Sequence, residues 1–245
     1  VESKMTIATF DQNFNSTPSY IAKVGMPIGM MYGYLYDGTY KLEEFDYVGG
    51  NYILKPGIAN YTAETGTQPG YPKYRDINGD GVIDSDDRTM IGRGDPKHIG
   101  GFTNNFEYKG FDFLAFFQGS VGNDILNILK YDIYSGTGWY NAPKDILRTF
   151  WNGQGSTNKN FAIDANSRMN LEMSEWYIED GSYMRLKNVQ IGYTLPASFT
   201  KKLTINNLRL FVSAQNLFTV TGYSGLDPEI GNNSPQYMGI DMGFY

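Results

Sequence analysis

The sequence has no cysteine, a single histidine (His98) and no apolar run long enough for a membrane-spanning helix. The lack of cysteine excludes disulfides, cysteine-ligated zinc and thiol catalysis. The single histidine borders a predicted strand, which favours a structural role over that of a general base. The longest basic run is Lys201-Lys202 and the net charge is −6, so nucleic acid is not an expected partner. A membrane β-barrel is compatible with all of these absences.

Several segments are rich in aromatic and β-branched residues and alternate between apolar and polar side chains. Such a period of two predicts strands with two different faces. Each segment spans about 10 to 15 residues, enough to cross a bilayer at a tilt. The predicted strands cover residues 5–14, 28–40, 98–108, 111–121, 182–196 and 207–220.

The last of these strands shows the alternation most clearly. It places Leu210, Val212 and Ala214 on one face and Arg209 and Ser213 on the other. In 182–196 the alternation changes phase around Lys187-Asn188, which predicts a β-bulge. Residues 98–108 and 111–121 are separated only by Lys109-Gly110, which predicts a tight hairpin.

The connections between predicted strands alternate between short and long. The long ones are residues 41–97 and 122–181, and the second contains two helical patterns, "NDILNILKYDIY" and "APKDILRTFW". Alternation of this kind is typical of a membrane barrel with turns on one side and loops on the other. The pattern predicts an all-β fold, an antiparallel transmembrane β-barrel segment with long extracellular loops that contain short helices.

The first long connection contains the stretch "DINGDGVIDSDD", which has the ligand register of an EF-hand-type calcium loop. Gly81 occupies the sharp turn of that register. Five carboxylates within twelve residues would repel one another without a cation. Asp87 stands where glutamate is usual, so we expect structural calcium of modest affinity. The predicted ligands are Asp76, Asn78, Asp80, the carbonyl of Val82, Asp84 and Asp87.

Other interpretations of this stretch stay open. A solvated Asp/Asn/Gly turn would contain the same residue types. A dockerin would need a second copy at short spacing, and the sequence has one.

Six strands are too few to close a membrane barrel, since single-chain examples begin at about eight. We therefore expect residues 1–245 to be part of a longer polypeptide. Five motifs in order resemble the C-terminal part of the SusC/RagA family of TonB-dependent outer-membrane transporters. They are "VGMPIGMMYGYLYDGTY", "YRDINGDGVIDSDDRTMIG", "YKGFDFLAFFQGSVGNDILN", "SYMRLKNVQIGYTLP" and "LRLFVSAQNLFTVTGYSGLDPEI".

The resemblance implies a large barrel of about 22 strands with a plug in its lumen. It also implies the outer membrane of a Gram-negative bacterium and import of oligosaccharides (glycans) or peptides. Energy would come through TonB, which contacts parts preceding this chain. A SusD-like surface lipoprotein would be the partner, and the lipid bilayer would surround the barrel.

Aromatic residues in and beside 122–181 are candidates for contact with substrate or partner, although loop packing or an interfacial girdle would also explain them. These candidates are Trp139, Tyr140, Trp151, Trp176 and Tyr177. Asp227 and Glu229 are expected to be turn residues. No paired acids outside the calcium-type loop indicate an enzyme.

The competing fold is a soluble calcium-dependent β-sandwich that binds glycan or protein. Dependence on detergent distinguishes it from a barrel segment.

Overall fold

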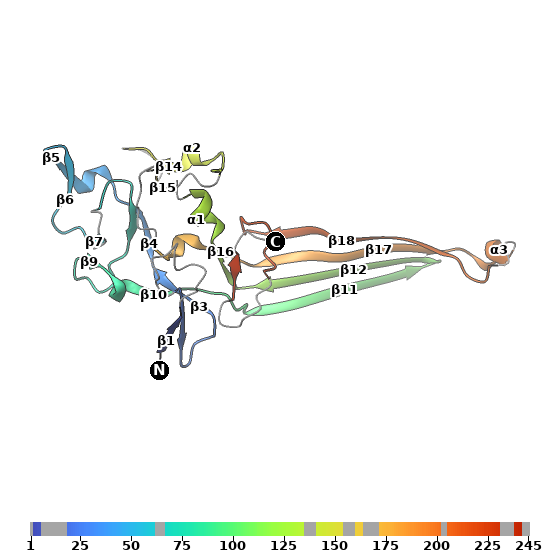
Figure 1. Ribbon diagram of the computed structural model, residues 1–245. Helices are drawn as coiled ribbons and strands as arrows, with labels where there is room; N and C mark the ends of the chain where they lie inside the picture. Colours follow the sequence, from blue (N-terminus) through green and yellow to red (C-terminus); the bar gives the residue numbers. More distant parts are fainter. Residues whose placement is uncertain are drawn as a thin grey trace. The chain divides into compact units, whose positions relative to one another are not determined.

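A computed structural model of the chain describes residues 2–5, 19–61, 67–134, 141–153, 160–163, 172–201, 205–230 and 238–241 (Figure 1). The chain divides into two compact units. The first unit comprises Val1–Asp95, Asp124–Glu179 and Ile230–Tyr245, and the second comprises Pro96–Asn123 and Asp180–Glu229. Among the described residues, no helix has both the length and the apolar character needed to cross a membrane.

The second unit is a four-stranded antiparallel sheet in the order β11-β12-β17-β18 (Figure 1). Its strands are His98–Tyr108 (β11), Phe111–Val121 (β12), Tyr183–Thr194 (β17) and Arg209–Thr221 (β18). A four-residue helix, Ala197–Thr200 (α3), lies in the connection between β17 and β18. All four strands were predicted from the alternation, with boundaries that differ by two residues or fewer.

The hairpin predicted at Lys109-Gly110 is confirmed. Both residues have positive φ angles, 47° and 87°, which suits a two-residue turn whose twist matches that of its strands. A Cβ atom at Gly110 would lie 2.8 Å from the carbonyl oxygen of Thr194. Glycine is therefore required here for its backbone freedom and for its small size.

The bulge predicted around Lys187-Asn188 is also confirmed. The register of β17 against β18 shifts between Leu186 and Asn188, and its register against β12 shifts between Phe116 and Phe117. On β18 the shift falls beside Asn216, whose φ of 50° is left-handed. The bulge keeps apolar residues on one face on either side of the phase change.

The first unit contains shorter strands and helices. A sheet in the order β1-β2-β3-β10 is formed by Glu2–Met5, Tyr20–Lys23, Met30–Tyr34 and Arg88–Arg93. A second sheet in the order β16-β13-β19 is formed by Ile178–Asp180, Asp124–Asn127 and Ile240–Asp241.

The remaining strands of this unit pair two by two. They are β4 (Tyr36–Thr39) with β8 (Pro72–Tyr74), β5 (Phe45–Val48) with β6 (Asn51–Leu54), β7 (Asn60–Tyr61) with β9 (Val82–Ile83), and β14 (Phe150–Trp151) with β15 (Asn160–Ala162). The helices are Leu42–Glu44 (η1), Ser85–Asp87 (η2), Leu129–Tyr134 (α1), Ile146–Thr149 (α2) and Glu175–Tyr177 (η3).

Here the structure departs from the expected strands at several points. The strand predicted over 28–40 is two strands, β3 and β4, interrupted at Leu35, and they pair with different partners. β10 lies inside the range 41–97 that was predicted as a loop, where it pairs with β3. Of the strand predicted over 5–14, residues 6–14 lie outside the described part.

The helical pattern beginning at Asn123 is half correct. Short helices do occur in 122–181, but residues 124–127 form β13, and α1 begins only at Leu129. Ile125 and Ile128 are buried as expected. The pairing of β13 with β16 and β19 overrides the local helical preference.

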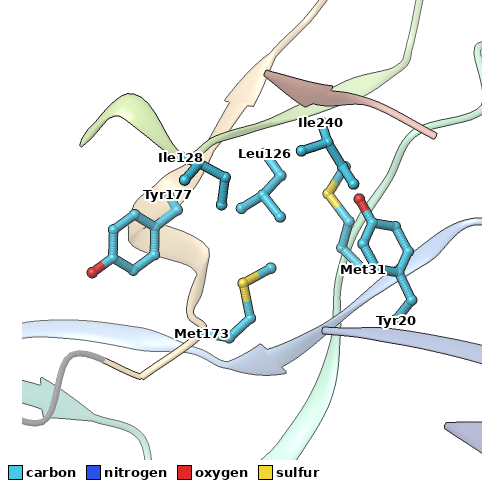
Figure 2. Packing of buried hydrophobic residues seen from close by; sticks show 7 residues of the cluster. All are labelled: Tyr20, Met31, Leu126, Ile128, Met173, Tyr177 and Ile240. Carbon is cyan, nitrogen blue, oxygen red and sulfur yellow. The ribbon is translucent and has the colours of Figure 1, made fainter. Parts of the chain in front are cut away.

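A hydrophobic cluster lies between these segments of the first unit (Figure 2). It brings together side chains from residues far apart in the chain: Tyr20, Met31, Leu126, Ile128, Met173, Tyr177 and Ile240. A Cβ atom at Gly33 would lie 2.3 Å from the carbonyl oxygen of Met173, to which the N–H of Tyr34 donates at 2.9 Å. This close approach joins β3 to the residues just before η3.

Candidate functional site

The sheet of the second unit has an apolar face. Residues paired directly across neighbouring strands point to the same side of a sheet. The registers therefore place Phe106, Phe113, Ile191 and Val212 on one side in one row. The same side also carries Phe102, Tyr108, Phe111, Ala115, Phe117, Met184, Leu186, Val189, Tyr193, Leu210, Ala214, Phe218 and Val220.

Many side chains of the apolar face are exposed within this unit. Phe106 is 68% exposed and Val212 is 77% exposed. A continuous apolar surface of this size on a long-stranded antiparallel sheet is suited to hydrocarbon. At the hairpin end, the rings of Phe111 and Tyr193 lie 4.5 Å apart, where an aromatic girdle would be expected.

The opposite face is polar. It presents Asn105, Glu107, Asp112, Gln118, Ser120, Arg185, Asn188, Gln190, Arg209, Ser213, Gln215 and Thr219. Four apolar residues, Ile99, Leu114, Phe116 and Phe211, share this side. A sheet that is apolar on one side and polar on the other is the arrangement of a barrel wall with an aqueous interior.

Two arginines on the polar face form ion pairs. Near the hairpin end, Arg209 Nε donates to Asp112 Oδ1 at 2.9 Å, and its Nη2 contacts the other carboxylate oxygen. Near the opposite end, Arg185 contacts both Asp227 and Glu229. The expectation that these two acids serve only as turn residues is therefore incomplete. The alternation predicted Arg209 on the face opposite to Leu210 and Val212, but nothing in the local sequence indicated the partners of Arg185.

Hydrogen bonds within the calcium-type loop of the first unit hold its conformation. Asp76 Oδ1 accepts from the N–H of Gly79 at 2.6 Å, and its Oδ2 accepts from the N–H of Gly81 at 2.8 Å. Gly79 and Gly81 both have positive φ angles, 78° and 85°. The predicted sharp turn at Gly81 is present.

The middle of the loop repeats this arrangement. Asn78 Oδ1 accepts from the N–H of Asp80, Asp80 Oδ1 accepts from the N–H of Val82, and Asp84 Oδ1 accepts from the N–H of Asp86. These side chains follow the short-range Asx pattern. They place carboxylate and amide oxygens around the loop, and hard oxygen donors are the ligand type that calcium prefers.

Asp87 differs from the other predicted ligands because its side chain is fully buried. Its Oδ1 accepts from the N–H of Ile77 at 2.7 Å and from that of Asn78 at 3.4 Å, and its Oδ2 accepts from the N–H of Asp84 at 2.9 Å. The carboxylate thus joins the beginning of the loop to its end. Both of its oxygens are already engaged by backbone donors.

Within the described part of the chain, no group of three or more histidine, cysteine, aspartate or glutamate side chains is arranged to hold a metal ion. The residue types of the loop fit calcium, whereas their side chains are turned to backbone N–H groups. Calcium binding by Asp76, Asn78, Asp80, Val82, Asp84 and Asp87 stays a prediction.

The loop is attached to a buried polar cluster. Arg88, the residue after Asp87, donates from Nη2 to Glu172 Oε2 at 2.8 Å, and both side chains are nearly inaccessible. The Tyr61 hydroxyl donates to Glu172 Oε1 at 2.6 Å, and the Tyr74 hydroxyl accepts from the N–H of Glu172 at 3.0 Å. Burial, together with the Glu172 carboxylate, raises the pKa of Tyr61 and of Tyr74 above the usual tyrosine range.

The aromatic candidates for contact with substrate or partner differ in their placement. Trp139 and Tyr140 lie outside the described residues. Tyr177 is fully buried in the cluster of Figure 2. Trp176 packs on Phe161 with ring centroids 4.8 Å apart.

The six-membered ring of Trp151 lies over Gly70, where a Cβ atom would approach its Cε3 to 2.4 Å. Trp151, Trp176 and Tyr177 thus have packing roles in the first unit. Their contact with substrate or partner stays a prediction.

Comparisons with known proteins give relatives along nearly the whole chain, although no protein-family profile matches it. TonB-dependent receptor P3 of Formosa agariphila is 37% identical over 239 residues, which cover 95% of this chain and 22% of that receptor. TonB-dependent receptor SusC of Bacteroides thetaiotaomicron is 27% identical over 167 residues, covering 64% of this chain and 15% of that receptor. The solved structure of the RagAB peptide transporter is 26% identical with a TM-score of 0.61, covering 90% of this chain and 22% of that chain.

The sheet is antiparallel and has one apolar and one polar face, and the chain matches these receptors. Together these findings define a segment of an outer-membrane-type β-barrel. The chain belongs to the SusC/RagA family of TonB-dependent receptors. It spans about a fifth of the length of the curated relatives it matches. These relatives are receptors and transporters, so the chain is not a segment of an enzyme.

Proposed function

We propose that the whole protein is an outer-membrane transporter of a Gram-negative bacterium and that this chain supplies part of its barrel wall. The observation that carries the proposal is the two-faced sheet of β11, β12, β17 and β18. Its apolar face suits lipid, and its ion-paired polar face suits a water-filled interior. The relationship to SusC and to other TonB-dependent receptors supports the same role.

The proposed cargo is a peptide or an oligosaccharide, imported with energy delivered through TonB. The likeness to a structure named as a peptide transporter supports the peptide class. A SusD-like surface lipoprotein is the proposed partner. The long connections within 41–97 and 122–181 are proposed to lie on the extracellular side. Residues 41–97 lead into β11, and residues 122–181 join β12 to β17, in both cases at the strand ends opposite to the Lys109-Gly110 turn.

Growth of the native bacterium tests this proposal. A strain deleted for the full-length gene is compared with its complemented strain on defined peptides and on defined oligosaccharides as sole nutrient sources. We expect a growth defect on one class only, and the same defect when TonB is depleted. Purification of the tagged full-length protein in detergent should recover a surface lipoprotein.

Normal growth of the deletion strain on every nutrient, with no lipoprotein recovered, would contradict the proposal. The soluble β-sandwich alternative makes the opposite prediction about purification. It requires a full-length protein that stays monomeric in buffer without detergent, and such behaviour would overturn the barrel assignment.

We also propose that residues 76–87 bind structural calcium in the whole protein. The ligand register, the five carboxylates and the loop fold centred on Gly79 and Gly81 support it. The hydrogen bonds that occupy Asp87 argue for modest affinity, because a cation would share its oxygens with backbone donors.

A further inference from the structure

The segment Gly222–Glu229, here called the strap, directly follows β18 and returns over the polar face of the sheet. β18 ends at Thr221, which pairs with Tyr183, whereas Arg185 pairs with Thr219 further inside the sheet. The strap nevertheless places two carboxylates on Arg185. It therefore folds back toward the interior instead of continuing past the sheet end.

Arg185 binds the strap through a fork of hydrogen bonds. Its Nε donates to Thr219 Oγ1 at 2.8 Å, its Nη1 donates to Glu229 Oε2 at 2.8 Å, and its Nη2 donates to Asp227 Oδ1. Lys187 Nζ donates to the same Glu229 oxygen at 2.6 Å. Two cations of β17 thus hold two anions of the strap.

Arg185 and its two carboxylate partners differ in solvent access. The Arg185 side chain is 8% exposed, so its guanidinium group is fixed and preorganised to bind the strap. Asp227 is 40% exposed and Glu229 is 33% exposed. Ion pairs with one partner accessible to solvent are weakened by salt and by competing ions.

Contacts within the strap also fix its conformation. The Tyr223 ring is nearly buried and covers Gly225, where a Cβ atom would lie 2.4 Å from ring atoms. The N–H of Glu229 donates to Asp227 Oδ1 at 2.8 Å, which sets both carboxylates toward Arg185. Leu226, between these contacts, is 73% exposed.

The pair between Arg209 and Asp112 provides a comparison within the same face. It joins β18 to β12 across Gly192 of β17, where a Cβ atom would meet both side chains. That pair links strands that the sheet already holds, so breaking it releases no segment. The ion pairs of Arg185 with Asp227 and Glu229 instead hold a segment that lies outside the strands.

We propose that the strap is a releasable element at the long-connection end of the barrel wall, latched by Arg185 and Lys187 through Asp227 and Glu229. When latched, it covers the polar face near that end. When the carboxylates are neutralised or screened, it leaves that face and opens more of it to passing cargo. This consequence for cargo rests on the proposed transport function, whereas the release itself does not.

A spin label on the strap tests the release. Leu226→Cys is introduced into the full-length protein. Residues 1–245 contain no cysteine, and any cysteine elsewhere in the protein is replaced so that only position 226 is labelled. The label is attached in detergent micelles and its mobility is measured by electron paramagnetic resonance. We expect a restrained label in the otherwise unchanged protein and a shift to a mobile spectrum in the Asp227→Asn/Glu229→Gln variant.

The matched control is Asp112→Asn, which breaks the other arginine pair of the face and should leave the spectrum unchanged. An unchanged spectrum in the double variant would overturn the proposal and make the strap a fixed brace. Should the double variant fail to fold, judged by heat-modifiable migration in gels, salt titration of the labelled parent decides. Mobility that increases with salt supports release, and mobility that stays constant refutes it.

Uptake assays separate this proposal from the transport function. A protein that shows strap release but no uptake of peptide or oligosaccharide would contradict the proposed function and leave the strap proposal standing. Uptake of cargo by a protein whose strap stays immobile in every condition would contradict the strap proposal and leave the proposed transport function standing.

Discussion

Asp87 closes the calcium-type loop with a buried carboxylate that accepts three backbone hydrogen bonds. Hydrogen bonds to an ionised acceptor stabilise the carboxylate in place of water. The carboxylate therefore fixes the two ends of the loop relative to one another. This role belongs to the protein chain itself and does not require a metal.

Replacing Asp87 with asparagine should lower the stability of the first unit. The amide offers one acceptor oxygen, so at least one buried N–H group, of Ile77 or of Asp84, loses its partner. We expect a cost of about 1–3 kcal/mol, measured as a lower denaturant midpoint for the full-length protein probed at loop tryptophans. Asp86→Asn is the control, because that side chain is exposed, and equal midpoints for the two variants would contradict this role.

At this scale the sequence indicated part of the site. The spacing of Asp76, Asn78 and Asp80 predicted the turn and its glycines, because such short-range patterns are encoded locally. The contacts of Arg185 with Asp227 and Glu229 were not predicted. Those residues lie 42 and 44 positions apart, and no local pattern specifies which charges meet across a sheet.

At the scale of the strands, the two faces of β18 should differ sharply in their tolerance of charge. Val212 lies on the apolar face and is 77% exposed, while its neighbour Ser213 lies on the polar face. An exposed apolar residue on a barrel wall contacts lipid, where a guanidinium loses hydration. An arginine on the polar face remains in water.

Val212→Arg should therefore destabilise the folded barrel by up to about 2–4 kcal/mol, depending on depth in the bilayer. Ser213→Arg should cost far less. Both are measured by urea unfolding of the full-length protein in phospholipid vesicles. Similar costs for the two positions would indicate that the assignment of the faces is incorrect.

The strands of the second unit were predicted almost to the residue because their period of two is long and changes phase only where β17 has its bulge. β10 was missed because each of its six residues is half-buried and its sequence, RTMIGR, lacks clear alternation. β13 was misassigned as helix because its apolar residues also fit a helical spacing. Its pairing with β16 and β19 comes from residues that no local window contains.

At the scale of the whole molecule, calcium should act as a brace on the connection within 41–97. We expect the intact protein to melt at a higher temperature with calcium than with a chelator, since binding to the folded state alone stabilises it. The difference should disappear in the Asp76→Asn/Asp80→Asn variant. Identical melting temperatures with calcium and with chelator would remove the proposed site and leave a loop that is stable on its own hydrogen bonds.

The two-residue turn at Lys109-Gly110 has a consequence for how this wall assembles. β11 and β12 meet with almost no chain between them, whereas β12 and β17 must be brought together across residues 122–182. The entropy lost on closing a loop grows with its length, and pairing between distant segments is slow. We therefore expect β11–β12 and β17–β18 to form first as separate hairpins, with the seam between β12 and β17 joining last.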